Sequence, residues 1–202
     1  MPAIRTYRLM RYLFFMMLIA GTVVRAESPG SLAGWAVEQG TQEPSYAVAE
    51  PVTTNLNIDT VVLACEEAWG HRVLQLQLYL TDDGPLQPRY LQLKPLRDDP
   101  RATISIDGKT FPVTLHFADD YVVLADSQEG PFPLLSEEFL DALQTGMTMT
   151  MQFDMLHEWP GQPPTFDSEA VVDLQAPGGR QAIASVRRCA RDLRVGTTLV
   201  HR

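Results

Sequence analysis

Methionine occupies every second position in one stretch of the chain, at Met147, Met149 and Met151, and His157 follows shortly after. Thioether sulfurs are soft ligands that select Cu(I), so these four side chains form a candidate copper site. Alternate residues of a β-strand lie about 6.6 Å apart, so three such sulfurs converge on one ion only if their side chains lean together. Methionine is also a common filler of apolar cores. We therefore predict a core strand without a bound metal and keep copper as the alternative.

The chain has two cysteines, Cys65 and Cys189. In an exported protein an even number of cysteines predicts a disulfide, because both thiols meet an oxidising environment. Closing so long a loop stabilises a fold by about 4–5 kcal/mol in the chain-entropy model. The alternative is a pair of buried free thiols. A disulfide leaves neither cysteine free as a nucleophile, and no Gly-x-Ser-x-Gly motif supplies a serine nucleophile. We therefore expect no catalytic activity.

Four arginines near the C-terminus form the most concentrated positive patch of the sequence: Arg187, Arg188, Arg191 and Arg194. In the last turns of a helix they would complement the helix dipole and pair with acidic neighbours. They would equally offer a docking face to an acidic partner. We favour the first interpretation and keep the second, a candidate partner-binding face, as the sharper hypothesis.

Other polar groups have simpler explanations. Gly178 and Gly179 precede a helix and their N–H groups could receive an anion, but an ordinary turn accounts for them. The histidines share no metal-ligand spacing, and the paired aspartates fall in turns. These residues are His71, His116, His157 and His201, and Asp82-Asp83, Asp98-Asp99 and Asp119-Asp120. No cofactor is therefore predicted.

Much of the remaining sequence alternates in the manner of β-strands. Over residues 72–80 four leucines face one way while Gln75, Gln77 and Tyr79 face the other, which indicates a strand with one wet face. Asp107-Gly108 indicates a hairpin with a type I′ turn. Asp98-Asp99-Pro100 predicts another turn. Strands are predicted over residues 58–65, 72–80, 90–93, 103–106, 111–117, 121–125, 147–155 and 166–174.

Two helices are also predicted. Ser136 is a good N-cap, acidic residues follow in the first turn, and Gly146 is a typical C-terminal stop. Leu135 and Leu140 occupy the positions of a hydrophobic staple. In the second helix one face carries an apolar stripe beside Cys189, formed by Ile183, Val186, Ala190 and Leu193.

Residues 1–26 have the pattern of a secretory signal peptide. Three arginines precede an apolar run over residues 13–24, and Val24-Arg25-Ala26 supplies small residues around a cleavage site. The run is shorter than the about 20 apolar residues that a membrane-spanning helix needs. We expect cleavage near Glu27 and a periplasmic protein without a membrane span; a retained anchor is the alternative.

The chain is acidic, with a formal charge of −9. Removing residues 1–26 takes away four of the 16 basic residues and no acidic ones, which leaves 12 basic against 25 acidic residues and a charge of −13. A protein with this charge repels phosphate backbones and anionic membrane surfaces. Nucleic acid is therefore not an expected partner.

The layout of the C-terminal half resembles two groups of small proteobacterial periplasmic proteins. The resemblance rests on the stretch SEEFLDAL at residues 136–143, two strands, and the spacing of Gly179, Ala182, Ile183, Val186 and Cys189. It is similar to proteins of the invasion-associated locus B (IalB) type and to VasI/TagO-type accessory proteins of type VI secretion. The resemblance implies a Gram-negative periplasm and a non-enzymatic role. The single cysteine pair departs from both groups, and no catalytic residue is transferred.

We therefore predict a mainly β (α+β) protein, an antiparallel β-sandwich or partly closed barrel of about eight to ten strands with two helices. After the signal peptide (1–26) we expect an extended N-terminal segment (27–56), one β-rich domain (57–195) and a frayed tail (196–202). The favoured function is a non-catalytic envelope protein that binds or assists another envelope or secreted protein. The alternatives are an inhibitor of a secreted enzyme, where the charge of −13 would steer a basic target, and a carrier of a small ligand or copper.

Overall fold

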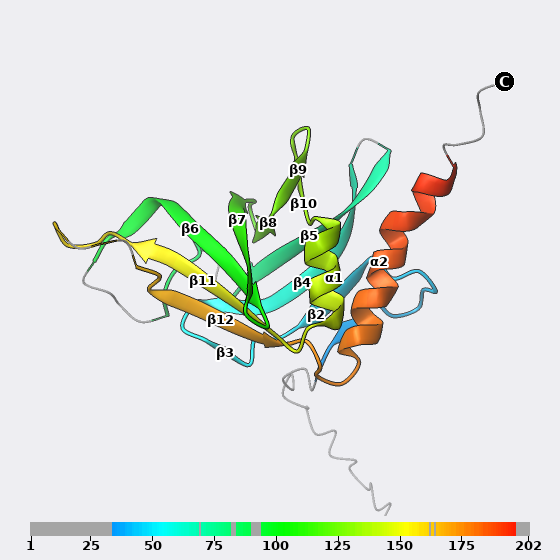
Figure 1. Ribbon diagram of the computed structural model, residues 1–202, viewed down its shortest axis with the longest axis horizontal. Coiled ribbons are helices and arrows are strands. Elements are labelled where there is room, and N and C mark those ends of the chain that lie inside the picture. Colours follow the sequence, from blue (N-terminus) through cyan, green and yellow to red (C-terminus); the bar gives the residue numbers. More distant parts are fainter. Residues whose placement is uncertain are drawn as a thin grey trace, which may run out of the picture. The chain divides into compact units, whose positions relative to one another are not determined.

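A ten-stranded antiparallel sheet dominates the structure (Figure 1). This computed structural model describes residues 34–68, 70–81, 84–89, 94–161, 163 and 165–196, without the side chains of residues 68 and 191–196. All of them belong to one compact unit, Ser31–Arg202. The predicted signal peptide, the strand predicted over 90–93, Asp82-Asp83 and the tail beyond residue 196 lie outside the described residues.

The strands of this sheet do not follow one another in chain order, because β6, β7 and β8 run in reverse order, so that β8 pairs with β5, and β3 lies at the far edge beside β12. A separate hairpin pairs β9 (Ser127–Glu129) with β10 (Phe132–Leu134). From one edge to the other the large sheet contains β1 (Ala36–Val37), β2 (Tyr46–Ala49), β4 (Ile58–Ala68), β5 (His71–Leu80), β8 (Tyr121–Ala125), β7 (Lys109–Phe117), β6 (Leu96–Ile106), β11 (Thr148–Leu156), β12 (Ser168–Asp173) and β3 (Thr53–Thr54).

Strand β7 makes the corner that curls the sheet into a half-barrel. Its first half, Lys109 to Val113, pairs with β6, whereas its second half, Thr114 to Phe117, pairs with β8. A strand that changes partner in this way lets two parts of a sheet face each other. The hairpin that starts β7 has Asp107 at φ 49° and Gly108 at φ 87°, which confirms the predicted turn with positive φ at both positions.

The two faces of the sheet carry different side chains. We call the face toward the core the inner face; it carries fully buried residues from both parts of the sheet, such as Leu63, Leu76, Ile104 and Met151. The opposite side is the outer face. The predicted strand over residues 72–80 is confirmed as β5, with Leu74, Leu76 and Leu78 on the inner face.

Two helices cover the inner face (Figure 1). Helix α1 (Glu137–Thr145) begins as predicted: the Ser136 hydroxyl accepts a hydrogen bond from the Phe139 N–H at 3.1 Å. Helix α2 (Gly179–Gly196) buries Ile183 and Val186 in the same cluster as the strands. The fold class predicted from the sequence, mainly β with two helices and a partly closed barrel, is confirmed.

The N-terminal segment ties the two ends of the sheet together. Trp35, next to β1, donates from its indole nitrogen to the Asp173 carbonyl at 2.9 Å and from its backbone N–H to the Pro177 carbonyl at 3.1 Å. A Cβ on Gly179 would meet the Trp35 ring at 2.9 Å, so this close approach requires glycine. Val52 donates to the Val171 carbonyl at 2.7 Å. The half-barrel is therefore held at its open side by residues that precede β4.

Several expectations need correction. Residues 34–56, expected as an extended segment outside the β-rich domain, supply β1, β2 and β3 to the sheet. Asp98-Asp99-Pro100 is not a turn but part of β6. It lies opposite the β-bulge in β11 and beyond the stretch of β6 that pairs with β7. The missing N–H of the proline therefore breaks no hydrogen bond between strands. The loop expected before α1 contains the β9–β10 hairpin.

The predicted disulfide joins Cys65 in β4 to Cys189 in α2, and it is expected to stabilise the half-barrel. Replacing both cysteines by serine should lower the free energy of unfolding by about 4–5 kcal/mol, because the unfolded chain loses a long closed loop. Urea denaturation of the oxidised protein measures the change. The reduced wild type is the control and should match the variant. A fall in the free energy of unfolding of less than about 1 kcal/mol would contradict a stabilising role of the disulfide.

Candidate functional site

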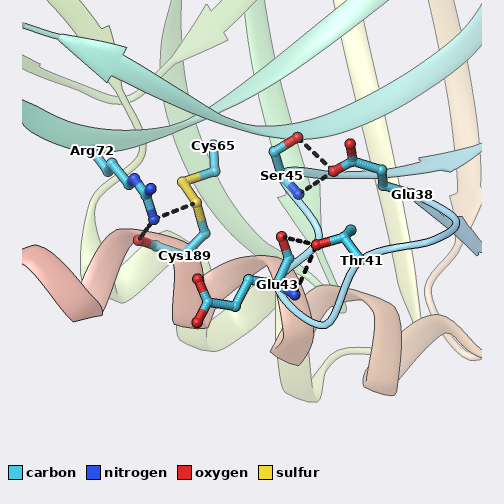
Figure 2. The surroundings of a disulfide bond; sticks show 7 residues. All are labelled: Glu38, Thr41, Glu43, Ser45, Cys65, Arg72 and Cys189. Carbon is cyan, nitrogen blue, oxygen red and sulfur yellow. Dashed lines mark hydrogen bonds between the residues drawn. A yellow bond between two sulfur atoms is a disulfide. The ribbon is translucent and has the colours of Figure 1, made fainter.

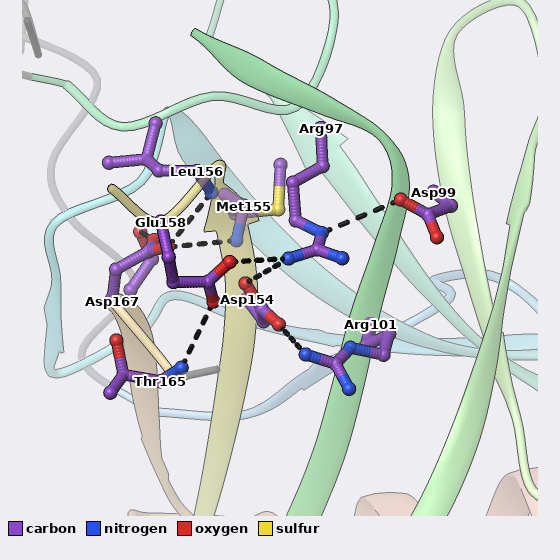
Figure 3. A network of polar contacts seen from close by, with 10 residues as sticks. Arg97, Asp99, Arg101, Asp154, Met155, Leu156, Glu158, Thr165 and Asp167 are labelled. Atoms are coloured by element: carbon purple, nitrogen blue, oxygen red, sulfur yellow. Dashed lines mark hydrogen bonds and ion pairs between the residues drawn. The ribbon is translucent and has the colours of Figure 1, made fainter. Parts of the chain in front are cut away.

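An ion-pair cluster around a buried aspartate joins the beginning of β6 to the end of β11 (Figure 3). Asp154 is only 1% exposed, and it pairs with Arg97 at 3.5 Å and with Arg101. Arg97 also pairs with Glu158 at 2.9 Å. The hydrogen bond to Asp154 raises the pKa of Arg101. The Glu158 carboxylate accepts hydrogen bonds from the backbone N–H groups of Glu158 itself and of Thr165, and these bonds lower the pKa of Glu158.

This cluster is occupied by its own charges. Removing one member of a buried ion pair leaves an uncompensated charge, at a cost of about 3–5 kcal/mol. Next to it the Asp167 carboxylate accepts from the N–H groups of Met155 and Leu156 at 3.0 and 2.9 Å, which fixes the bulge in β11 (Figure 3). The cluster thus holds the strand ends together and offers no open binding position.

The arginine patch of α2 is only partly a surface. Arg187 is 5% exposed and donates to Glu137 at 2.9 Å and Asp141 at 2.8 Å, both on α1. It is therefore a link between the two helices and is not available to a partner, as the ion-pairing interpretation expects. Arg188 is exposed and donates to the Ser185 hydroxyl at 3.1 Å. The side chains of Arg191 and Arg194 lie outside the described part of the chain.

The methionines of the candidate copper site do not gather. Met149 and Met151 are fully buried on the inner face among other core side chains. Met147 lies just before β11 and is 62% exposed, and His157 is exposed beyond the other end of that strand. Core packing therefore accounts for the two buried thioethers. Among the described residues no group of three or more His, Cys, Asp or Glu side chains is arranged to hold a metal ion.

The disulfide fixes the end of β4 to the middle of α2 (Figure 2). Arg72 of β5 donates to the Cys189 carbonyl at 3.4 Å, so β5 also contacts this helix. Beside the disulfide, the Ser45 N–H and hydroxyl both donate to Glu38 at 2.8 Å, and these bonds lower the pKa of Glu38 (Figure 2). The backbone next to Tyr46 is thereby fixed at the edge of the outer face.

The outer face of β2, β4, β5 and β8 is more apolar and more covered than alternation predicts. Register places Val48, Val62, Gln77 and Val123 side by side across the four strands. Gln77 is only 2% exposed, and Gln75 is buried too. The expectation that these glutamines line a wet face is wrong: Gln75 lies against the Pro133 carbonyl of β10, and Gln77 lies between Val62 and Val123 of the neighbouring strands.

A chain of hydrogen bonds satisfies these buried amides. The Tyr79 hydroxyl donates to Gln77 Oε1 at 3.5 Å, and Gln77 Nε2 donates to Glu66 Oε1 at 3.0 Å. Gln77 Nε2 also lies 3.3 Å from Gln75 Oε1, and Gln75 Nε2 donates to the Pro133 carbonyl at 2.8 Å. Because buried polar groups are costly when unpaired, this chain fixes the side chains of the outer face in one arrangement.

A hollow of about 360 Å³ opens on this face, and we call it the tyrosine hollow. Tyr46 and Tyr79 are 42% and 37% exposed and lie at opposite corners of it. The Tyr79 ring stacks on Tyr121 with 5.4 Å between centroids. Burial first, then the negative charge of Tyr121, Glu66 and Asp120, raises the pKa of Tyr79. The hollow is lined by Ser45, Tyr46, Val48, Thr60, Val62, Ala64, Cys65, Glu66, Gln77 and Tyr79.

No family model, curated protein or solved structure matches this chain, so the resemblance to the two periplasmic groups stays an expectation. Helices that could span a membrane, by length and apolar character together, are not found in the described part of the chain.

The raised pKa of Tyr79 predicts a late step in the tyrosine titration of the folded protein. Tyr79 should ionise above its ordinary value of about 10, and Tyr79→Phe should remove that step. Because the folded pKa is raised, the contribution of Tyr79 to stability is complete below pH 10 and is lost as pH rises through the higher folded value. Absorbance of tyrosinate measures it, and the same titration in concentrated guanidinium chloride is the control. An unchanged curve for Tyr79→Phe above pH 10 would contradict the assignment.

Proposed function

We propose that the protein is exported to the periplasm and acts there without catalysis, binding or assisting another envelope or secreted protein through its outer face. Support for export comes from the signal-peptide pattern of residues 1–26 and from the cysteine pair. Support for binding comes from the tyrosine hollow and the strands around it. The choice of partner class follows from the properties of that face.

The observation that carries the proposal is the pair of exposed tyrosines above a floor of valines and the hydrogen-bonded Gln77. Tyr46 and Tyr79 stand on neighbouring parts of a hydrogen-bonded sheet, above Val48 and Val62. Tyrosine is enriched in protein interfaces, where it buries a large area with little loss of side-chain entropy. Side chains that are already fixed before binding reduce the entropy lost in a complex. The outer face therefore has the make-up of a protein-recognition surface.

Other surfaces of the fold are less suited to this role. The inner face is filled by α1 and α2. The edge strands β1 and β3 have two residues each, so they offer a partner strand little backbone to pair with. Recognition through side chains of the outer face is therefore favoured over strand addition.

Two alternatives have an observation in their favour. The charge of −13 after removal of residues 1–26 would steer a basic enzyme toward this protein, which suits an inhibitor. The tyrosine hollow itself, at about 360 Å³, falls in the size range of small-ligand sites, which suits a carrier. A copper carrier has less support, because Met149 and Met151 are buried in the core.

Photocrosslinking in cells tests the proposal. A photoreactive amino acid at Thr60, which lines the tyrosine hollow, should capture a defined envelope or secreted protein. The matched control is Thr150 in β11, which is also half-buried but lies on the other part of the sheet. Capture of the same proteins from both positions, or no capture from Thr60, would contradict the proposal.

A further inference from the structure

We propose that the tyrosine hollow is a receptor for a cationic side chain of the partner protein, an arginine in the first place. This inference deepens the proposed function and rests on it. It assigns to the hollow a ligand chemistry, a guanidinium group held by a carboxylate and against a tyrosine ring. Tyr46, Tyr79 and Glu66 are the residues that would hold it.

The walls of the hollow are suited to a cation. Tyr46 and Tyr79 stand at opposite corners with exposed aromatic surface, and the floor between them is formed by Val62 and the buried Gln77. The negative face of an aromatic ring attracts a cation that lies within about 6 Å of its centre. An anion would meet aromatic side chains and a carboxylate, so the hollow disfavours anionic ligands.

Glu66 supplies the counter-charge. It accepts one hydrogen bond, at Oε1 from Gln77 Nε2 at 3.0 Å, which turns its carboxylate back over the hollow. In the part of the chain that the structure describes, its second oxygen accepts no hydrogen bond and no lysine or arginine forms an ion pair with it. Glu66 is also the one acidic residue among those that line the hollow.

The surroundings of the hollow strengthen this charge. Burial first, and then the charges of Tyr121, Glu66 and Asp120, raise the pKa of Tyr79, so two carboxylates lie close enough to this wall of the hollow to act on its hydroxyl. The whole chain carries a formal charge of −9. A basic partner would be drawn to the protein at long range and would find an uncompensated carboxylate at the hollow.

Arginine is the better fit of the two basic residues. Its planar guanidinium donates two parallel hydrogen bonds to a carboxylate and stacks on an aromatic ring, whereas the ammonium group of lysine is a compact and strongly hydrated charge. Tyr79, already fixed by Tyr121 at 5.4 Å and by Gln77, presents such a ring without further ordering. The partner would therefore place an exposed arginine at the centre of its contact surface.

The experiment uses N-acetyl-arginine methylamide and its neutral isostere, N-acetyl-citrulline methylamide, as probes for the full chain. Backbone NMR shifts of Val62 and Gln77 are followed during each titration. The arginine probe should bind with a dissociation constant on the order of millimolar, as a single side chain without its protein would. The citrulline probe should cause no saturable shift.

Variants assign the binding to the named residues. Glu66→Gln should weaken arginine binding roughly tenfold, since it removes a charge-assisted contact and keeps the shape. The matched control is Glu67→Gln, an exposed glutamate one residue along β4 and on its other side, which should bind as the wild type does. If Glu66→Gln fails to fold, Tyr46→Leu on β2 provides the second variant and should also weaken binding.

Three results would overturn the inference: equal binding of both probes, no binding of the arginine probe, or self-association that shifts the same signals without any probe. These outcomes are distinct from a failure of the proposed function. If Thr60 captures a partner protein but the arginine probe does not bind, the proposed function stands and the arginine receptor is wrong. If the arginine probe binds but Thr60 captures no protein, the cation site stands and the proposed protein partner is wrong.

Discussion

The burial of the apolar stripe of α2 against the inner face is the interaction on which the rest of the structure depends. Without a helix packed against it, the inner face of the half-barrel would be exposed to water. Ile183 and Val186 fill that space with no exposed surface, and each such side chain contributes roughly 1.5–3 kcal/mol. Arg187 then binds α1 to the same helix, and the disulfide binds it to β4. The helix is fixed by apolar, ionic and covalent contacts at once.

This arrangement separates the two faces of the sheet by role. The inner face is filled by core side chains, so the partner recognition that we propose would use the outer face. On β2, β4, β5 and β8 the outer face is not simply wet: Gln75 and Gln77 are buried and hydrogen-bonded, and Tyr46 and Tyr79 stand above them. Fixed amides beneath exposed tyrosines give a surface that is ordered before it meets a ligand.

Local patterns in the sequence predict much of this fold. Alternation in β5, the Asp107-Gly108 hairpin and the Ser136 cap each depend on neighbours in the chain, so they are visible in the sequence and confirmed in the structure. The pairing of Cys65 with Cys189 follows from there being two cysteines.

The candidate site was not predictable in the same way. Alternation tells which side of β5 faces away from the core, but not that Val123 of β8, distant in sequence, lies beside Gln77. The tyrosine hollow depends on register across strands, which no local pattern encodes. Likewise ion pairing of Arg187 was expected, but its acidic partners could not be named, because they lie on α1, 46 and 50 residues earlier. One available signal was the alternation of Gln75, Gln77 and Tyr79, polar residues long enough to form a hydrogen-bonded chain.

The most direct measurement of the central claim is hydroxyl-radical footprinting in intact cells compared with the purified protein. Tyr46 and Tyr79 are exposed in the structure, as are Trp159 and Phe166, which do not line the hollow. If the outer face is the partner-binding surface, Tyr46 and Tyr79 lose reactivity in cells, whereas Trp159 and Phe166 are modified equally in both samples. Equal modification of all four residues in cells and in the purified protein would contradict the account.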